Sequence, residues 1–364
     1  MKYIYSIIPG NERTTFGSIG IGRHGDEVYT QPYLDIAAVV SDCPFIDFYG
    51  MAKEKLVLCL AEHQRATEEV MKKQATILPV KFGTLLEDEG EVEDMLRWGY
   101  RDLEAGLAAM EGKIEVEVVA TWDVQQVFAE IGQEEEIAKL KAEIADKPPW
   151  QTISTQVRLG QMVKASLDRR KQEHRRKMLD FLAGHAADVQ VNMAPADQVV
   201  MNVAFLIDAY RQDDFEAKVH QLDERFGGRL NFRLVGPLPP YSFSTVEVRK
   251  VSAEEVEEAR KLLGLGMEAT DREIQKAYRR QARRHHPDVA PDDPEAEERF
   301  RRIAAAYRLL ASCCRAQSSL KGSPEGSPRR GTERCSFDLA VVGRVFLVAV
   351  RRSEELVGKG DSWQ

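Results

Sequence analysis

Residues 272–288 join a dense run of basic side chains to a short polar motif, and this combination suits three kinds of chemistry. Over residues 272–284 six basic side chains stand against one acid, Glu273, and the run leads into His286, Pro287 and Asp288. Basic side chains can neutralise nucleic-acid phosphates, an imidazole beside a carboxylate can ligate a metal ion, and a basic helix with an exposed loop can dock on another protein. The surrounding elements decide among these possibilities.

The basic run has the pattern of an amphipathic helix that stops at the polar motif. Its apolar stripe consists of Ile274, Ala277, Tyr278 and Ala282. Because Pro287 disfavours helical geometry at His286 and lacks an N–H, we expect His286 and Asp288 to lie on an exposed loop. Two adjacent histidines and one Asp point in different directions, so we expect no metal site. The segment lacks the aromatic side chains on which nucleic-acid bases stack, which argues against nucleic-acid binding. The remaining interpretations are a solvated basic helix and a protein-docking surface.

Length, charge and cysteines restrict the class of protein. A chain of 364 residues favours two or three domains. The net charge is −8, and residues 267–364 contain 19 basic and 15 acidic side chains, which leaves −12 on the first 266 residues. This acidic body argues against nonspecific nucleic-acid binding. The five cysteines include one vicinal pair and no CxxC, so we expect no disulfide framework or zinc site, and a reducing cytosol.

The first 250 residues alternate strand-like and helix-like segments, which predicts an α+β body. Residues 2–8, 35–41 and 76–84 have the composition of strands, and 51–74 and 91–110 have helical spacing, so we expect a first α+β domain over residues 1–112. Residues 113–250 follow the order β-α-β-β-α-β, which predicts a ferredoxin-like domain.

The C-terminal third is helical and then changes composition. Two capping boxes, Ser252 with Glu255 and Thr270 with Glu273, begin helices in residues 251–317, where we expect a small three-helix unit. Residues 318–334 are rich in Ser, Gly and Pro, and we expect residues 318–364 to form a flexible tail. The apolar segment 339–350 is interrupted by Arg344 and is too short to span a bilayer.

The helical unit resembles the J-domain of DnaJ-type co-chaperones over about 55 residues. The resemblance rests on the His-Pro-Asp loop and on apolar residues at matching spacing: Leu263, Leu265, Ile274, Ala277, Tyr278, Phe300, Ile303, Ala306, Tyr307 and Leu310. It implies that the basic helix and loop dock on a DnaK-type chaperone and stimulate its ATP hydrolysis. The docking residues would be Lys276, Arg279, Arg280, Arg283, His286, Pro287 and Asp288.

The body resembles the gas vesicle accessory family GvpF/GvpL over roughly residues 1–248. The resemblance rests on KYIYSII at the start, Glu62-His63, LPVKFGT at 78–84, NVAFLI at 202–207 and GPLPPYSF at 236–243. It implies binding of the hydrophobic shell protein, with Pro79, Phe82, Gly83, Gly236, Pro237, Pro239, Pro240, Tyr241 and Phe243 as candidate contacts. The plainer interpretation is that these residues pack within the fold.

No catalytic set accompanies these motifs. Glu62 and His63 have no nucleophile partner apart from Cys59, which at that helical position is better explained as core filling. We therefore expect no enzyme, cofactor or membrane segment. The resemblances together predict a cytoplasmic, gas-vesicle-associated assembly factor whose partners are shell protein, other gas vesicle proteins and a DnaK-type chaperone. The alternatives are a general J-domain co-chaperone with a client-binding body, and a ferredoxin-like enzyme with a helical regulatory tail.

Overall fold

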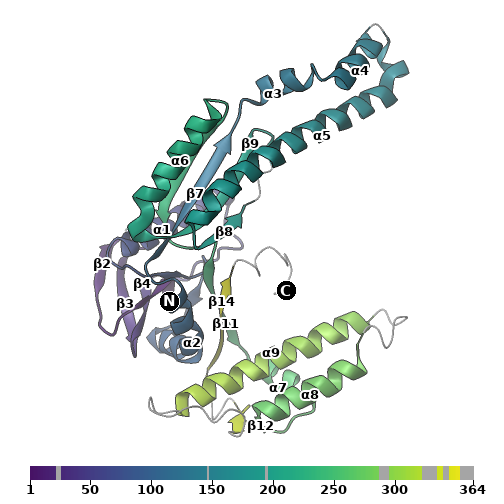
Figure 1. The fold of residues 1–364 in the computed structure, drawn as a ribbon. Helices are drawn as coiled ribbons and strands as arrows, with labels where there is room; N and C mark the ends of the chain where they lie inside the picture. Colours follow the sequence, from purple (N-terminus) through teal and green to yellow (C-terminus); the bar gives the residue numbers. More distant parts are fainter. Residues whose placement is uncertain are drawn as a thin grey trace. The chain divides into compact units, whose positions relative to one another are not determined.

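The computed structural model describes residues 1–21, 26–145, 147–192, 196–286, 295–321, 334–338 and 344–352. The chain forms two compact units (Figure 1). Unit 1 comprises Met1–Glu111 with Ser244–Gln364, and unit 2 comprises Gly112–Phe243. Unit 2 is thus inserted between the two halves of unit 1. Among the described residues, no helix has the length and apolar character needed to cross a membrane.

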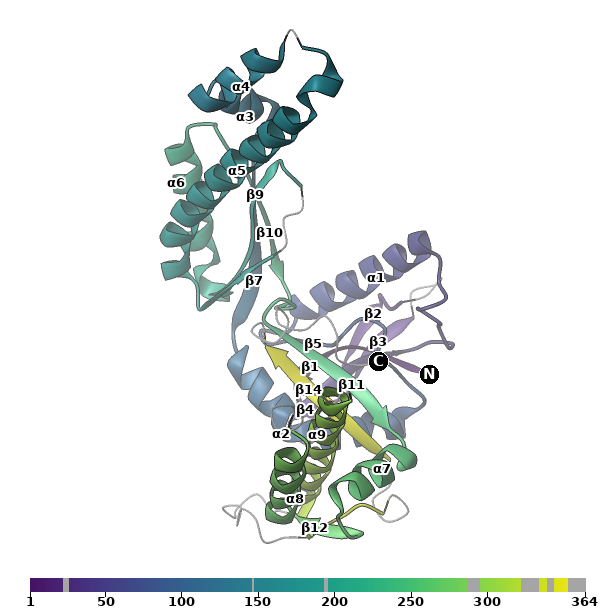
Figure 2. The same cartoon turned by 90° about the vertical axis from the view of Figure 1, so that its right-hand side faces the viewer.

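Unit 1 is built on an antiparallel sheet in the order β2-β3-β4-β1-β5. Its strands are β1 (Lys2–Pro9), β2 (Thr15–Ser18), β3 (Glu27–Tyr33), β4 (Ile36–Asp42) and β5 (Leu78–Pro79), with β6 (Leu85–Leu86) also paired to β1. Strand β1 is buried along almost its whole length because helices α1 (Lys53–Met71) and α2 (Glu89–Ala109) both pack against it (Figure 2). The run KYIYSII is accordingly apolar without strict alternation.

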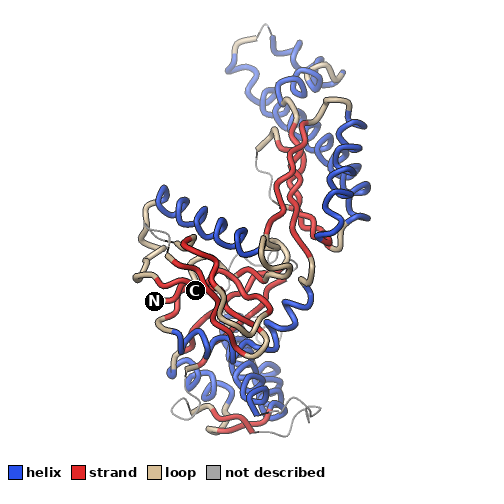
Figure 3. The backbone as a smooth tube through the Cα atoms, turned by 90° about the vertical axis from the view of Figure 1, so that its left-hand side faces the viewer, coloured by secondary structure: helices blue, strands red, loops and turns tan. Residues whose placement is uncertain are grey.

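Unit 2 has the ferredoxin-like topology that its element order predicts. Its sheet runs in the antiparallel order β10-β7-β9-β8, and Figure 3 shows its strands beside the helices that cover them. The strands are β7 (Lys113–Thr121), β8 (Asp188–Val191), β9 (Val199–Asp208) and β10 (Asn231–Leu238). The helices are α3 (Val124–Ile131), α4 (Glu135–Ala145), α5 (Pro149–Leu182) and α6 (Gln212–Phe226), with short 3-10 turns at Ala183–His185 and Ala209–Arg211.

The helical unit consists of α7 (Ala253–Leu263), α8 (Asp271–Arg284) and α9 (Ala296–Lys321). Both predicted capping boxes are present, at Ser252 and Thr270. Strand β11 (Ser244–Val251) comes immediately before α7 and pairs along its length with β14 (Val345–Arg352) (Figure 2). The helices are therefore inserted between two paired strands of unit 1, and a flexible linker does not join them to the body at β11.

The prediction of a flexible tail over 318–364 is wrong for the residues that the structure describes there. Helix α9 continues to Lys321, β13 (Arg334–Ser336) pairs with β12 (Glu268–Thr270), and β14 pairs with β11. The Ser/Gly/Pro-rich composition of 318–334 carries no information about the apolar strand that follows it. That strand is stabilised by pairing and packing with segments far away in the sequence.

The expectation about cysteines also needs a correction. Cys314 on α9 and Cys335 on β13 form a disulfide, with their Cα atoms 5.1 Å apart. Gln317 reinforces the link, because its side-chain amide donates to the Ser336 carbonyl at 2.7 Å and accepts from the Ser336 N–H at 2.8 Å. The pairing was not predicted because it depends on α9 lying beside β13, which the spacing of the cysteines does not reveal.

Candidate functional site

The outer face of α8 carries a basic stripe formed by Arg272, Lys276, Arg279 and Arg283. These positions are three or four residues apart, so they follow one another along a single side of the helix. All four side chains are exposed, whereas Ile274 is fully buried on the opposite side. None of the four pairs with a carboxylate among the described residues, and the stripe is a positive surface directed to solvent.

Arg280, which the sequence grouped with the docking residues, lies to one side of this stripe. Its Nη2 donates to the carbonyl of Leu263 at 3.1 Å, at the C-terminal end of α7. That helix is capped at its C-terminus by Gly264, which has a left-handed φ of 67°. Arg280 therefore ties α8 to the end of α7. In the sequence, the basic character of Arg280 did not distinguish this structural role from a role in docking.

His286 lies against the start of α9. Its ring contacts the edge of Phe300, with ring centroids 5.2 Å apart, and the side chain is half-buried. Tyr278 and Tyr307 stack at 4.5 Å and join the same two helices further along. Helix α8 ends at Arg284, close to the predicted stop. The predicted docking residues Pro287 and Asp288 lie outside the described residues.

The helical unit meets the rest of unit 1 through α9. This helix contacts α2 and β14 on one side and α7 and α8 on the other. Trp98 of α2 donates its indole N–H to the Arg344 carbonyl at 2.7 Å, and the Arg344 guanidinium lies 3.0 Å from Asp94. The start of β14 is thus fixed to α2 near α9, while the basic stripe on α8 stays uncovered.

In the body, the sequence motifs KYIYSII, Glu62-His63 and LPVKFGT meet in one buried aromatic cluster. The Gly83 N–H donates to the Tyr3 hydroxyl at 3.1 Å, and that hydroxyl lies 2.9 Å from Nδ1 of His63. The direction of the Tyr3–His63 bond follows the histidine tautomer, because the hydroxyl has one proton to donate and can also accept. Phe82 packs edge-on against His63 with a centroid separation of 5.6 Å.

Burial keeps the imidazole in this cluster neutral. His63 is 2% exposed, and burial lowers its pKa to about 4, although a hydrogen bond with the Val80 backbone acts in the opposite direction. Burial also raises the pKa of the Cys59 thiol on the same helix. A neutral histidine bonded to Tyr3 and Val80, beside a thiol that resists ionisation, gives packing and no nucleophile–base pair.

The predicted contact residues of LPVKFGT divide by exposure. Pro79 is buried in β5, and Phe82 and Gly83 are half-buried in the aromatic cluster. Gly83 has a φ of 85°, a conformation that favours glycine. Pro79 therefore offers no surface to a partner, and the motif as a whole joins α1 to strand β1 of the sheet.

The segment GPLPPYSF in unit 2 is fixed by a residue that the sequence did not single out. The buried carboxylate of Glu115 on β7 accepts hydrogen bonds from the Ser242 N–H at 2.8 Å and from the Ser242 hydroxyl at 2.6 Å. Burial raises the pKa of Glu115, and the bonds from Ser242 oppose that rise. The only available signal was the pair of acids, Glu115 and Glu117, within the otherwise apolar strand KIEVEVV.

The predicted contact residues of GPLPPYSF also divide by exposure. Pro239, Pro240 and Phe243 are buried, Tyr241 is half-buried, and Gly236 and Pro237 are exposed. Gly236 has a φ of 152°, and a Cβ at this position would lie 3.0 Å from the Glu115 carbonyl oxygen. Most of this segment therefore packs against β7, which agrees with the plainer interpretation.

Unit 1 also presents large apolar side chains to solvent within residues 45–60. We call this set the apolar surface: Phe45, Tyr49, Val57, Leu58 and Leu60, each at least 45% exposed. The helix expected over 51–74 has Leu56, Leu60, His63 and Ala66 at the spacing of one amphipathic face. The structure instead buries Cys59, His63, Ala66, Thr67 and Val70. Large exposed apolar side chains so close together in the sequence are candidates for contact with a partner.

Comparisons with known proteins match the α+β body and the helical unit to two different families. A family model described as gas vesicle synthesis protein GvpL/GvpF matches residues 1–245, and a DnaJ domain model matches residues 260–315. Gas vesicle protein F of Microcystis aeruginosa is 27% identical over 247 residues, covering 66% of this chain and 97% of that protein. Gas vesicle protein F of Dolichospermum flosaquae is 24% identical, covering 67% and 98%.

The helical unit and the fold of the body have separate matches. Chaperone protein DnaJ of Halothermothrix orenii is 52% identical over 50 residues, which cover 14% of this chain and 13% of that protein. The crystal structure of gas vesicle protein GvpF from Anabaena sp. PCC7120 aligns with a TM-score of 0.56 at 22% identity, covering 66% of this chain and 96% of that one. This structural likeness concerns the fold.

Proposed function

Because the chain belongs to the GvpL/GvpF family of gas vesicle synthesis proteins and carries a DnaJ domain, we propose that it is an accessory protein of gas vesicle assembly. The body binds the hydrophobic shell protein and limits its aggregation or helps nucleate the shell. The DnaJ domain brings a DnaK-type chaperone to that client and stimulates its ATP hydrolysis. The protein acts in the cytoplasm and at the gas vesicle, with other gas vesicle proteins as further partners.

The observation that carries the chaperone half of this proposal is the exposed basic stripe on α8. Arg272, Lys276, Arg279 and Arg283 face solvent on one helix side, next to the loop that contains His286. Positive charge of this kind favours docking on an acidic protein surface and speeds the encounter. Because the body contacts α9, chaperone docking on α8 leaves the body free to hold a client.

The client half rests on family membership and on accessible apolar residues. A shell protein with exposed strand edges is an aggregation hazard before assembly, so a binder must cover apolar area. The apolar surface at residues 45–60 offers such area in unit 1. Among the predicted contact residues, Gly236, Pro237 and Tyr241 remain accessible in unit 2. The buried Pro79, Pro239, Pro240 and Phe243 support these segments from within.

The alternative is a general J-domain co-chaperone. It is favoured by the chemistry of the apolar surface, which consists of large apolar side chains that select poorly among hydrophobic clients. Client selectivity separates the two functions. A gas vesicle factor discriminates in favour of shell protein, whereas a general co-chaperone protects unrelated aggregation-prone proteins equally well.

The test is the soluble fraction of shell protein co-expressed with the full chain, alone and with a DnaK-type chaperone. The full chain is needed because a truncation at residue 250 removes β14 from α2. The full chain should raise the soluble fraction of shell protein and leave an unrelated aggregation-prone client unchanged. The His286→Gln variant should keep this effect but lose the additional gain from the chaperone. Equal protection of both clients would favour the general co-chaperone, and protection of neither would overturn the proposal.

A further inference from the structure

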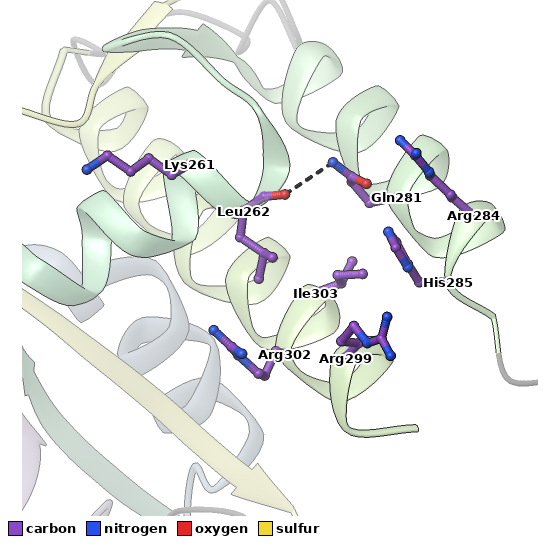
Figure 4. Close-up of a pocket in the computed structure, with 8 residues that line it drawn as sticks. All are labelled: Lys261, Leu262, Gln281, Arg284, His285, Arg299, Arg302 and Ile303. Atoms are coloured by element: carbon purple, nitrogen blue, oxygen red, sulfur yellow. Dashed lines mark hydrogen bonds between the residues drawn. The ribbon is translucent and has the colours of Figure 1, made fainter. Parts of the chain in front are cut away.

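A groove of about 440 Å³ lies between α7, the end of α8 and the start of α9. Figure 4 shows the eight residues that line it: Lys261, Leu262, Gln281, Arg284, His285, Arg299, Arg302 and Ile303. None of the basic-stripe residues is among them. The groove is therefore a separate feature of the helical unit, on a different side of α8 from the proposed chaperone-docking face.

The lining is strongly basic, and no carboxylate belongs to it among the residues that the structure describes. Arg284 and Arg302 make no ion pair with any residue that the structure describes, and Arg299 lies 3.6 Å from Glu295 Oε2. Lys261 contributes less, because Figure 4 shows it extending away from the other residues. It also shares the Glu257 carboxylate with Arg260. Three arginines and a histidine facing one groove create a positive potential that attracts anions.

The remaining lining residues give the groove a fixed, partly apolar wall. Ile303 is 2% exposed, and Leu262 is half-buried next to it in the lining. The Gln281 side-chain amide donates to the Leu262 carbonyl at 3.2 Å, which holds α8 and α7 together at this point (Figure 4). The groove thus combines cationic groups with an apolar patch on helices that are braced against each other.

From this chemistry we infer that the groove binds a small phosphorylated ligand of nucleotide size. Guanidinium groups bind phosphate oxygens through paired hydrogen bonds, which suits Arg284, Arg299 and Arg302. The volume falls within the range of about 300–1,000 Å³ that is usual for small-molecule sites and exceeds the needs of one phosphate group. Leu262, which is half-buried and backed by the buried Ile303, then contacts the organic part of the ligand.

The test is calorimetric titration of the full chain with ATP in the absence of magnesium, and in parallel with inorganic pyrophosphate. The Arg284→Gln/Arg302→Gln variant removes two groove charges. The Arg301→Gln/Arg308→Gln variant removes two exposed α9 charges outside the groove and serves as the matched control. Circular dichroism verifies that both variants keep their helices.

We expect ATP to bind more tightly than pyrophosphate. The groove variant should bind ATP at least about tenfold more weakly, since each charge-assisted hydrogen bond contributes roughly a tenfold factor or more, and the control should change little. If both variants bound ATP equally weakly, the loss would be due to the change in net charge, and the proposed site would be overturned. Absence of ATP binding to the wild-type chain would also overturn it, as would tighter binding of a glutamate-rich peptide than of ATP. None of these readouts depends on shell protein or chaperone.

Discussion

Gly99 on α2 faces Val348 on β14 so closely that a Cβ on Gly99 would lie 2.7 Å from the valine side chain. About two turns further along α2, Gly106 faces Val350 in the same way, with a corresponding distance of 3.1 Å. These two glycines lie on one side of α2, and because they have no side chains the C-terminal strand β14 packs directly against the helix there. Through β14 and β11, the two ends of the inserted helical unit become part of the packing of the body.

Replacing Gly99 by alanine should destabilise unit 1, even though alanine favours helix by about 1 kcal/mol. The added Cβ overlaps Val348, and overpacking costs roughly 1–3 kcal/mol. The Val348→Ala change removes the two γ-methyl groups but keeps the Cβ that would lie 2.7 Å from the new one, so it should relieve part of the overlap. The double variant should then be more stable than the summed losses of the two single variants predict. Denaturant unfolding of the four chains measures this coupling. Strict additivity would mean that α2 and β14 do not pack as described.

The stability of unit 1 should fall between pH 6.5 and pH 4 because of His63. Burial lowers the pKa of His63 to about 4 in the folded state, so the unfolded chain binds the proton more readily over this interval. The full shift corresponds to about 3 kcal/mol at 1.36 kcal/mol per pH unit. The His63→Phe variant should lose this component. The check is the difference between the two pH profiles of unfolding, and parallel profiles would contradict the prediction.

Ser242→Ala should destabilise unit 2 by roughly 1.5–3 kcal/mol, since it removes a hydrogen bond to the buried Glu115 carboxylate. The loss should increase as the pH rises above the Glu115 pKa, because the ionised carboxylate needs its donors more than the neutral form does. Ser242→Thr keeps the hydroxyl and is the control. Thermal unfolding at two pH values tests this, and an equal loss at both would show that Glu115 stays in one protonation state.

The basic residues of α8 should separate into two functional classes. Replacing Lys276, Arg279 and Arg283 by alanine should lower the stimulation of a DnaK-type ATPase at least about tenfold, most strongly at low salt, with little change in stability. Arg280→Ala should instead lower the stability of the helical unit by about 1 kcal/mol, since it removes the bond to Leu263. ATPase assays and thermal unfolding distinguish these outcomes. A loss of stimulation without loss of stability in Arg280→Ala would place it in the docking face.

The apolar surface should matter more for shell protein than the accessible end of GPLPPYSF does. Replacing Val57, Leu58 and Leu60 by serine removes exposed apolar area without opening the core. We expect this variant to lose most of the gain in soluble shell protein, while Tyr241→Ser keeps at least half of it. Co-expression followed by fractionation measures both. The opposite ranking would move the client-binding site to unit 2.

Features determined by local sequence were predictable. The capping boxes at Ser252 and Thr270, the stop of α8 next to Pro287 and the element order of unit 2 all depend on residues close together in the chain. The resemblance of residues 1–248 and of the helical unit to known families had the same basis, and the comparisons confirm both. For these features the sequence alone was sufficient.

The tertiary structure decided every feature that joins distant segments. The β11–β14 pairing, the Cys314–Cys335 disulfide and the Glu115–Ser242 anchor each bring together residues separated by 21 to over 100 positions. The elements packed against α1 also decide which side of that helix is buried. Its sequence is compatible with an apolar stripe through Leu60 as well as one through His63, and only His63 is buried. Such pairings gain stability only when the whole unit closes, because packing and not local propensity compensates the entropy of closing a long loop. Hence sequence patterns located the helices and motifs, and only the folded chain revealed that its C-terminal strand belongs to the body.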